Sequence, residues 1–172
     1  GNVYSVMSDS NCAGSYVLRY NNLLSLTDLM AHSLQSPQGR GTKSWEVYGN
    51  KIVFLDGAGG NVGFLRGGTG MFFYNYVTGS YYSNYIVAFD NVRSFTAFGM
   101  NPYSGKCDGT SNWDGNVLSN GWPCRDQIGR GPDVGTDSSV IGKATSSEPA
   151  YVWLNKRSTG ANINAQAVNN TS

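Results

Sequence analysis

The stretch Trp45-Glu46-Val47-Tyr48-Gly49-Asn50 combines an alternating apolar run with an aromatic residue, one intervening residue and an asparagine. Three further stretches follow the same pattern, residues 17–22, 70–75 and 86–91. Their aligned asparagines are 28, 25 and 16 residues apart, at Asn22, Asn50, Asn75 and Asn91. Repetition at intervals of about 20–50 residues is typical of proteins built from stacked repeats.

Each stretch has the chemistry of a β-strand, being rich in β-branched and aromatic residues and bounded by Gly, Asn or Ser. Shorter candidates lie between them, at residues 51–55, 61–65 and 76–77, separated by glycine-rich corners. Several short strands per repeat, stacked repeat on repeat, predict a parallel coil with ladders of inward side chains. An asparagine at the same corner of each turn would bind backbone groups and the next asparagine. In a regular strand, the side chain of this asparagine would point to the same side as the aromatic residue two positions before it. Only one of the two can keep regular strand geometry, so a turn is expected at the asparagine.

Composition narrows the function classes. The 172 residues suffice for one domain, and only 13% are charged, about half the usual ~25%. With 23 glycines and 13% aromatic residues, the chain favours strands and turns. A net charge of +1 gives no electrostatic basis for binding nucleic acid, and no apolar stretch reaches the ~18 residues of a membrane span. We therefore expect neither nucleic acid nor membrane as a partner. One helix-like segment, residues 23–34, predicts a loop or short helix.

Three segments resemble rungs of the right-handed parallel β-helix proteins of the pectate-lyase-like superfamily: residues 40–50, 66–73 and 121–131. The resemblance extends over residues 1–157 and implies an all-β, right-handed parallel β-helix. Members of this superfamily are secreted, phage-borne or on the cell surface, so it implies an extracellular or cell-surface location, a phage virion included. The same fold serves lyases, hydrolases, adhesins and inert spacers, so function must be argued from the site.

We predict a β-helix of about four or five turns over residues 1–100, a loop-rich C-terminal cap over residues 101–157, and a flexible tail over residues 158–172. Residues 148–154 predict a last strand docked on the stack. The cap would protect the exposed strand edges at that end of the coil. The N-terminal end shows no cap, which predicts a missing upstream portion or end-to-end packing of subunits into homo-oligomers.

Residues between Cys107 and Cys124 form a loop rich in turn formers and poor in apolar anchors. A disulfide closing it would stabilise the fold by roughly 3 kcal/mol and would imply an oxidising compartment; the alternative is two buried free thiols. The same loop gathers oxygen ligands at Asp108, Asp114 and Asn116. They make a weak calcium candidate, which lacks the EF-hand order, and the alternative is a plain turn-rich loop. No other cofactor is expected.

Aromatic residues carry the main functional signal. Outward aromatic rings on a rigid sheet can stack against sugar rings. The candidates for glycan binding are Tyr81, Tyr82, Tyr85 and Trp113. The alternative is that most aromatic residues form inward core ladders, and rows that stay exposed would favour glycan binding or self-association.

No catalytic residue can be assigned from the sequence. A polysaccharide lyase would need basic residues such as Arg40, Lys43 or Arg66, but no acidic trio is in register with them. The alternative is solvated surface charge. We therefore expect a non-catalytic extracellular module, structural or glycan-binding, whose partner is a polysaccharide or cell-surface glycan. The first alternative is a polysaccharide lyase or glycoside hydrolase acting on an acidic polysaccharide. The second is a self-assembling filament subunit.

Overall fold

The structure, a computed structural model, describes residues 8–10, 14–24, 29–31, 41–55, 61–79, 85–92, 128–133 and 145–170. These residues form β-strands joined by turns and loops, and none of them is helical, so they offer no helix to span a membrane. The all-β fold class expected from the sequence is confirmed for this part of the chain.

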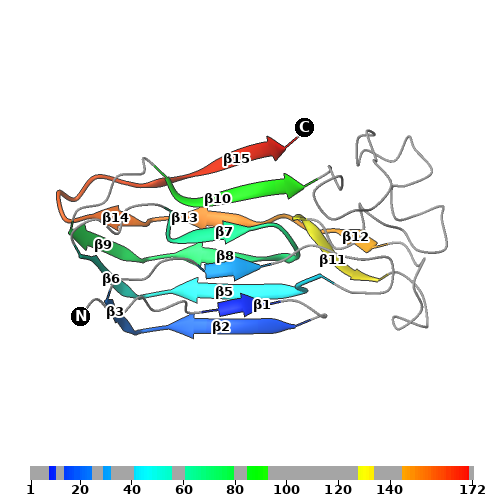
Figure 1. The fold of residues 1–172 in the computed structure, drawn as a ribbon, viewed down its shortest axis with the longest axis horizontal. Helices are drawn as coiled ribbons and strands as arrows, with labels where there is room; N and C mark the ends of the chain where they lie inside the picture. Colours follow the sequence, from blue (N-terminus) through cyan, green and yellow to red (C-terminus); the bar gives the residue numbers. More distant parts are fainter. Residues whose placement is uncertain are drawn as a thin grey trace.

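Most strands belong to three sheets in which neighbouring strands are parallel (Figure 1). The first sheet consists of β2 (Ser15–Arg19), β5 (Ser44–Tyr48), β8 (Thr69–Phe73) and β13 (Tyr151–Trp153). The second consists of β3 (Asn22–Leu24), β6 (Lys51–Phe54), β9 (Tyr76–Gly79) and β14 (Lys156–Arg157). The third consists of β1 (Ser8–Ser10), β4 (Leu29–Ala31), β7 (Gly63–Leu65), β10 (Tyr85–Val92) and β15 (Asn164–Asn170). Strands β11 (Arg130–Asp133) and β12 (Thr145–Ser147) form a separate antiparallel pair.

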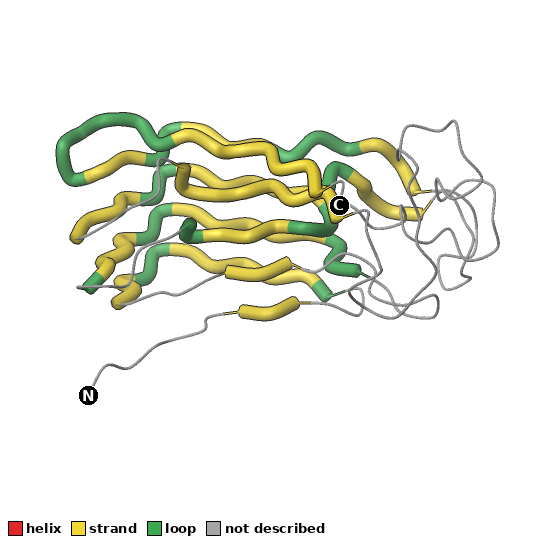
Figure 2. Tube along the Cα trace, turned by 45° about the horizontal axis from the view of Figure 1, so that its top comes forward, coloured by secondary structure: helices red, strands yellow, loops and turns green. Residues whose placement is uncertain are grey.

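The chain visits the first, second and third sheets in the same order four times. The passes are β2-β3-β4, β5-β6-β7, β8-β9-β10 and β13-β14-β15. Figure 2 shows strands of successive passes lying above one another. Corresponding residues are therefore in register from pass to pass, and one inward column contains Leu18, Val47, Phe72 and Val152. The parallel stacking of strands expected from the repeat is confirmed.

The register corrects the alignment of the repeat. Arg19 pairs with Tyr48, so Asn21 rather than Asn22 corresponds to Asn50. The stretch at residues 86–91 lies in β10 of the third sheet and pairs with β7, so it is not a member of the first-sheet repeat. Its place is taken by β13, which pairs with β8 and is the docked last strand predicted at residues 148–154. The sequence of β10 matches the repeat pattern because β10, like the first-sheet strands, packs against the core and contains apolar and aromatic residues followed by an asparagine.

Four asparagines form a hydrogen-bonded ladder between the first and second sheets. At each step, the backbone N–H and the side-chain Nδ2 of one asparagine donate to Oδ1 of the next, at 2.9–3.2 Å. Each Nδ2 also donates to a backbone carbonyl, at 2.9–3.0 Å. The members are Asn21, Asn50, Asn75 and Asn155. The amide ladder predicted from the repeat is confirmed, with Asn21 and Asn155 in place of Asn22 and Asn91.

The core lies between the sheets and follows strand alternation. In β5, Trp45 and Val47 are buried whereas the residues between and beside them are partly exposed. Trp45 is fully buried and its Nε1 donates to the carbonyl of Gly67 at 3.2 Å. Gly70 is in register with Trp45, and a Cβ there would collide with the Trp45 carbonyl. The ring of Trp45 therefore fits in the core because the residue in register with it on the next pass, Gly70, has no side chain.

Two segments differ from expectation. Residues 23–34, predicted as a loop or short helix, contribute to β3 and contain β4, because Leu23 lies in one buried column with Ile52 and Val77. Residues 164–170, predicted within a flexible tail, form β15 in register with β10. Just before β15, Ile163 is buried and donates its N–H to the carbonyl of Asn155 at 2.9 Å. Burial of this side chain explains why the segment docks on the stack.

Candidate functional site

The outward surface of the first sheet carries two columns of large side chains. Inward residues alternate with outward ones along each strand, so the register fixes which outward residues meet. One outward column contains Arg19, Tyr48, Phe73 and Trp153. The next contains Val17, Glu46, Met71 and Tyr151. We call the surface formed by Tyr20, Tyr48, Phe73, Tyr74, Tyr151 and Trp153 the aromatic face.

Three rings of the aromatic face stack on one another. Tyr48 and Phe73 lie with centroids 4.8 Å apart and planes 10° apart, and Phe73 and Trp153 with 4.3 Å and 4°. These distances match the ~4.8 Å spacing of neighbouring strands, so the stack is a direct product of the register. Both faces of the Phe73 ring are covered by its neighbours. Among the described residues, no ring stacks on the other face of Trp153, because β13 is the last strand of its sheet.

Two exposed tyrosines stand beside this stack on bent backbone. Tyr20 and Tyr74 have φ of +55° and +52°, in the left-handed region that non-glycine residues rarely adopt. The intervening pass has Gly49 at the equivalent position, and a Cβ there would lie 2.7 Å from two ring atoms of Tyr20. Tyr20 thus leans over Gly49, with its ring at 86° to Tyr48. Tyr20 and Tyr74 are 75% and 60% exposed, so their rings remain accessible.

The bend resolves the conflict seen in the sequence. The aromatic residue points outward and the asparagine two positions later points into the ladder, although regular alternation would place them on one side. The left-handed residue between them reverses the direction of the side chains. The turn therefore lies one residue before the asparagine rather than at it.

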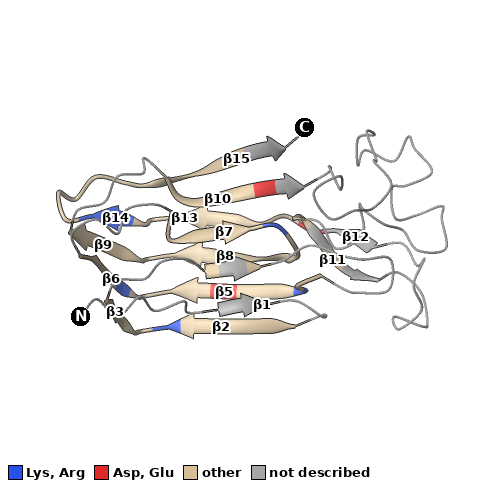
Figure 3. Cartoon of the chain, viewed as in Figure 1, with Lys and Arg blue, Asp and Glu red and all other residues tan. Residues whose placement is uncertain are grey.

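Positive charges gather at the corner beside the aromatic face. Arg19 ends β2, Lys51 begins β6 and Lys156 begins β14 (Figure 3). Lys51 and Lys156 are in register on either side of Tyr76. Arg19 Nη1 donates to Tyr48 Oη at 3.1 Å, and this hydrogen bond raises the pKa of Arg19 above its ordinary value. Arg19 is therefore a permanent cation at the edge of the stack.

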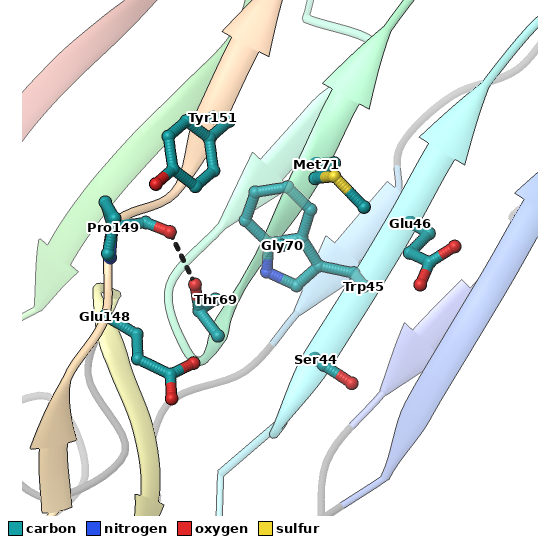
Figure 4. A pocket seen from close by; sticks show the side chains of 9 residues that line it. All are labelled: Ser44, Trp45, Glu46, Thr69, Gly70, Met71, Glu148, Pro149 and Tyr151. Atoms are coloured by element: carbon teal, nitrogen blue, oxygen red, sulfur yellow. Dashed lines mark hydrogen bonds between the residues drawn. The ribbon is translucent and has the colours of Figure 1, made fainter.

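A cleft of about 370 Å³ opens next to the stack (Figure 4). The hydroxyl of Thr69 donates to the carbonyl of Pro149 at 2.7 Å and joins β8 to the segment before β13. Tyr151, 53% exposed, belongs both to this cleft and to the aromatic face, where its ring stands at 88° to Trp153. The lining residues are Ser44, Trp45, Glu46, Thr69, Gly70, Met71, Glu148, Pro149 and Tyr151.

The cleft brings together two carboxylates that are far apart in sequence. Glu46 and Glu148 lie on opposite sides of the opening in Figure 4. The backbone N–H of Glu148 donates to the carbonyl of Gly129 at 2.9 Å. Within the described residues, no group of three or more His, Cys, Asp or Glu side chains is placed to hold a metal ion.

Of the four glycan-binding residues predicted from the sequence, the structure describes only Tyr85. Tyr85 is exposed at the start of β10, but this strand belongs to the third sheet and not to the aromatic face. Tyr81, Tyr82 and Trp113 lie outside the described residues, as do Cys107 and Cys124 and the calcium candidates Asp108, Asp114 and Asn116. The disulfide and the calcium site therefore stay predictions.

Of the three basic residues named for a lyase, the structure describes Arg66 and Lys43, which lie next to strands of different sheets. Arg66 follows β7 in the third sheet, where its Nε lies 3.3 Å from Oδ2 of the fully buried Asp90. Lys43 precedes β5, and its backbone carbonyl accepts the N–H of Thr69 at 3.2 Å. Arg40 lies outside the described residues.

Sequence reasoning missed the aromatic face although the signal was present. Tyr48 and Phe73 are the aromatic residues of the repeat itself, and Trp153-Leu154-Asn155 repeats their spacing to the asparagine. Glu148 carries no such signal, since its position at the cleft depends on how the fourth pass docks. Comparisons of the chain with known protein families, with curated proteins and with solved structures found no match.

Proposed function

We propose that the chain is a right-handed parallel β-helix of the pectate-lyase-like kind, in which each pass through the three sheets is one turn. Three observations support this proposal: the constant order in which the sheets are visited, the parallel pairing within them, and the asparagine ladder. An experimental structure with antiparallel hairpins between residues 16 and 91 would contradict it.

We further propose that this β-helix is a non-catalytic extracellular module that binds a polysaccharide or cell-surface glycan through the aromatic face. The observation that carries the proposal is a set of exposed rings held at fixed positions: Tyr20, Tyr74, Tyr151 and Trp153. Sugar rings stack their apolar faces on aromatic rings, while hydroxyl groups around them supply hydrogen bonds. Because strands and ring contacts already order these side chains, little conformational entropy is lost on binding.

The stack and the free rings have different roles in this proposal. Phe73 offers a ligand only its edge, since Tyr48 and Trp153 cover its faces. It therefore supports the surface rather than binding a sugar. The rings with accessible faces are those set at a steep angle to the stack, Tyr20, Tyr74 and Tyr151. The terminal ring of the stack, Trp153, also has one accessible face.

The test is a glycan panel followed by calorimetry with the best ligand. Tyr74→Ala and Tyr151→Ala are each expected to weaken binding by about tenfold, as central aromatic contacts do at interfaces. Tyr85→Ala is the matched control, because Tyr85 is also exposed but lies on the third sheet. Loss of binding in Tyr85→Ala, with Tyr74→Ala and Tyr151→Ala unaffected, would contradict the aromatic face and favour the site predicted from the sequence.

A glycoside hydrolase is the second candidate, because Glu46 and Glu148 line one cleft. Glycoside hydrolysis requires two carboxyl groups on either side of the scissile bond. Reducing sugar released by the wild-type protein, and lost in Glu46→Gln or Glu148→Gln, would replace the binding proposal with a catalytic one. A lyase has less support, since Arg66 is engaged by Asp90.

A self-assembling filament is the remaining alternative. End-to-end growth needs unpaired strand edges at the end of the stack. The edge of β14 is covered by the chain itself, through the bridge between Lys156 and Asn162. This contact disfavours continuous growth. A molar mass that stays that of the monomer in light scattering as the protein concentration rises would exclude the filament.

A further inference from the structure

The residues that line the cleft beside the aromatic face include two carboxylates and, among the described residues, no Lys or Arg. Among the described residues, neither Glu46 nor Glu148 forms an ion pair. Arg19 lies in the column next to that of Glu46, and the two charges attract each other, but the guanidinium donates its hydrogen bond to Tyr48 and does not line the cleft. Charged groups at least partly withdrawn from water in a cleft are stabilised by a partner of opposite charge. The cleft therefore favours a positively charged ligand group.

The backbone of Glu148 is fixed by its neighbours. Its backbone N–H is bonded to Gly129, and its side chain lies against Gly131 of β11. A Cβ at Gly131 would collide with the carboxyl group of Glu148. The hydrogen bond from Thr69 to Pro149 fixes the next residue in the chain. The backbone that carries one carboxylate of the cleft is thus ordered before any ligand arrives, which lowers the cost of binding.

The rest of the lining selects an organic cation over a metal ion. Calcium and magnesium need six or more oxygen ligands around one point. Here, the two carboxylates stand on opposite sides of the cleft, and the thioether of Met71 and the ring of Tyr151 complete the wall (Figure 4). An ammonium group can donate hydrogen bonds to carboxylates while the carbon atoms attached to it contact apolar and aromatic surface.

We propose that the cleft binds the protonated amino group of an amino sugar within the glycan. This inference rests on the proposed function, because the neighbouring sugar would lie at Tyr151 and Trp153. These two residues are two positions apart on β13, about 7 Å along the strand, a distance on the scale of one sugar ring. Glu46 is in register with Met71 and Tyr151, so its carboxylate lies one column from the stack. A glycan running along the strands would place one ring at the stack and the next amine in the cleft.

The experiment compares three oligosaccharides of one length and linkage by calorimetry at low salt. They are a fully deacetylated glucosamine oligomer, its N-acetylated form and the neutral glucose oligomer. We expect the deacetylated oligomer to bind about tenfold more tightly, as charge-assisted hydrogen bonds imply. Glu46→Gln and Glu148→Gln should each remove this preference, so that the deacetylated oligomer binds no more tightly than the acetylated one. The preference should also vanish as the pH rises through the pKa of the sugar amine.

Lys51→Gln is the control, since it changes an exposed charge outside the cleft and should leave the preference in place. Equal binding of all three oligosaccharides would overturn the amine assignment while leaving glycan binding intact. Binding of Nα-acetyl-lysine amide in a Glu46- and Glu148-dependent way, with no oligosaccharide bound, would overturn the sugar assignment in favour of a lysine side chain. No binding of any probe, together with a negative glycan panel, would reject the proposed function as well.

Discussion

Asn75 Nδ2 donates to Oδ1 of Asn155 at 2.9 Å, although 80 residues separate the two in the sequence. Asn75 also accepts from the N–H and Nδ2 of Asn50 at 3.2 and 2.9 Å, and donates to the carbonyl of Val47 at 3.0 Å. Only 1% of Asn75 is exposed, so these partners replace water. The ladder thus joins the third and fourth passes across the long segment that separates them.

Asn75→Ala is expected to lower the free energy of unfolding by about 3–5 kcal/mol, because it leaves several buried polar groups without partners. The groups are the N–H and Nδ2 of Asn50 and the carbonyl of Val47. Urea denaturation followed by circular dichroism measures the loss. Asn22→Ala is the matched control, since Asn22 is exposed beside the ladder and should change stability by less than about 0.5 kcal/mol. Equal losses in the two variants would contradict the ladder.

Gly70→Ala tests the packing of the largest core ring. The new Cβ would collide with the carbonyl of Trp45 and lie 2.8 Å from its ring atom Cδ2. Because Trp45 is fully buried, its ring has no room to retreat, and we expect a loss of about 2–3 kcal/mol. Gly160→Ala is the control: a Cβ there meets nothing within 4 Å, and only its φ of +82° costs about 1 kcal/mol. In thermal unfolding, the melting temperature of Gly70→Ala should be clearly lower than that of Gly160→Ala.

Short-range pattern predicted the strands and the ladder because both depend on neighbouring residues. Residues 45–50 contain the alternation, the aromatic residue and the asparagine that define one rung. The fourth rung could not be counted from spacing, since Asn155 follows Asn75 only after an intervening segment whose length the repeat does not determine. Residues 86–91 satisfied the pattern as well, and only the pairing of β10 with β7 shows that they belong to another sheet.

The candidate site was less predictable than the fold because it depends on register. Whether Tyr48 and Phe73 point inward or outward is decided by which alternate residues, here Trp45 and Val47, enter the core. The density of tyrosines around residues 74–85 predicted a site that includes Tyr85, and Tyr85 lies on the third sheet rather than on the aromatic face. A tertiary contact, the docking of the segment before β13 on β8, creates the cleft, and no local pattern encodes it.

Phe73 and Trp153 are expected to stabilise the fold cooperatively. Their parallel rings should show a coupling free energy of about 0.5–1.5 kcal/mol in a double-mutant cycle with Leu at both positions. The measurement is chemical denaturation of the two single variants and the double variant. A cycle of Phe73 with Tyr85, which lies on the third sheet, should give a coupling near zero. Additive effects for Phe73 and Trp153 would mean that the stacked geometry contributes nothing beyond burial.

Arg66 is expected to act in stability and not in ligand binding. Its Nε lies 3.3 Å from Oδ2 of Asp90, which is fully buried, and its guanidinium lies 4.6 Å from the centre of the Phe64 ring. Arg66→Met removes the cation but keeps most of the side-chain stem. Because the buried carboxylate of Asp90 then loses its ion pair with Arg66, we expect the free energy of unfolding to fall by up to about 3 kcal/mol. Lys51 is an exposed cation, so Lys51→Met should change the free energy of unfolding by less than about 0.5 kcal/mol.

The double variant Arg66→Met/Asp90→Leu separates this role from catalysis. Replacing a buried ion pair with apolar residues of similar size is often nearly neutral, so the double variant should regain most of the stability lost in Arg66→Met. The affinity for the best glycan should then equal that of the wild-type protein, because Arg66 and Asp90 belong to the third-sheet side of the molecule. A stable double variant that had lost turnover of a uronate polysaccharide would instead identify Arg66 as part of a lyase site and would overturn the non-catalytic function.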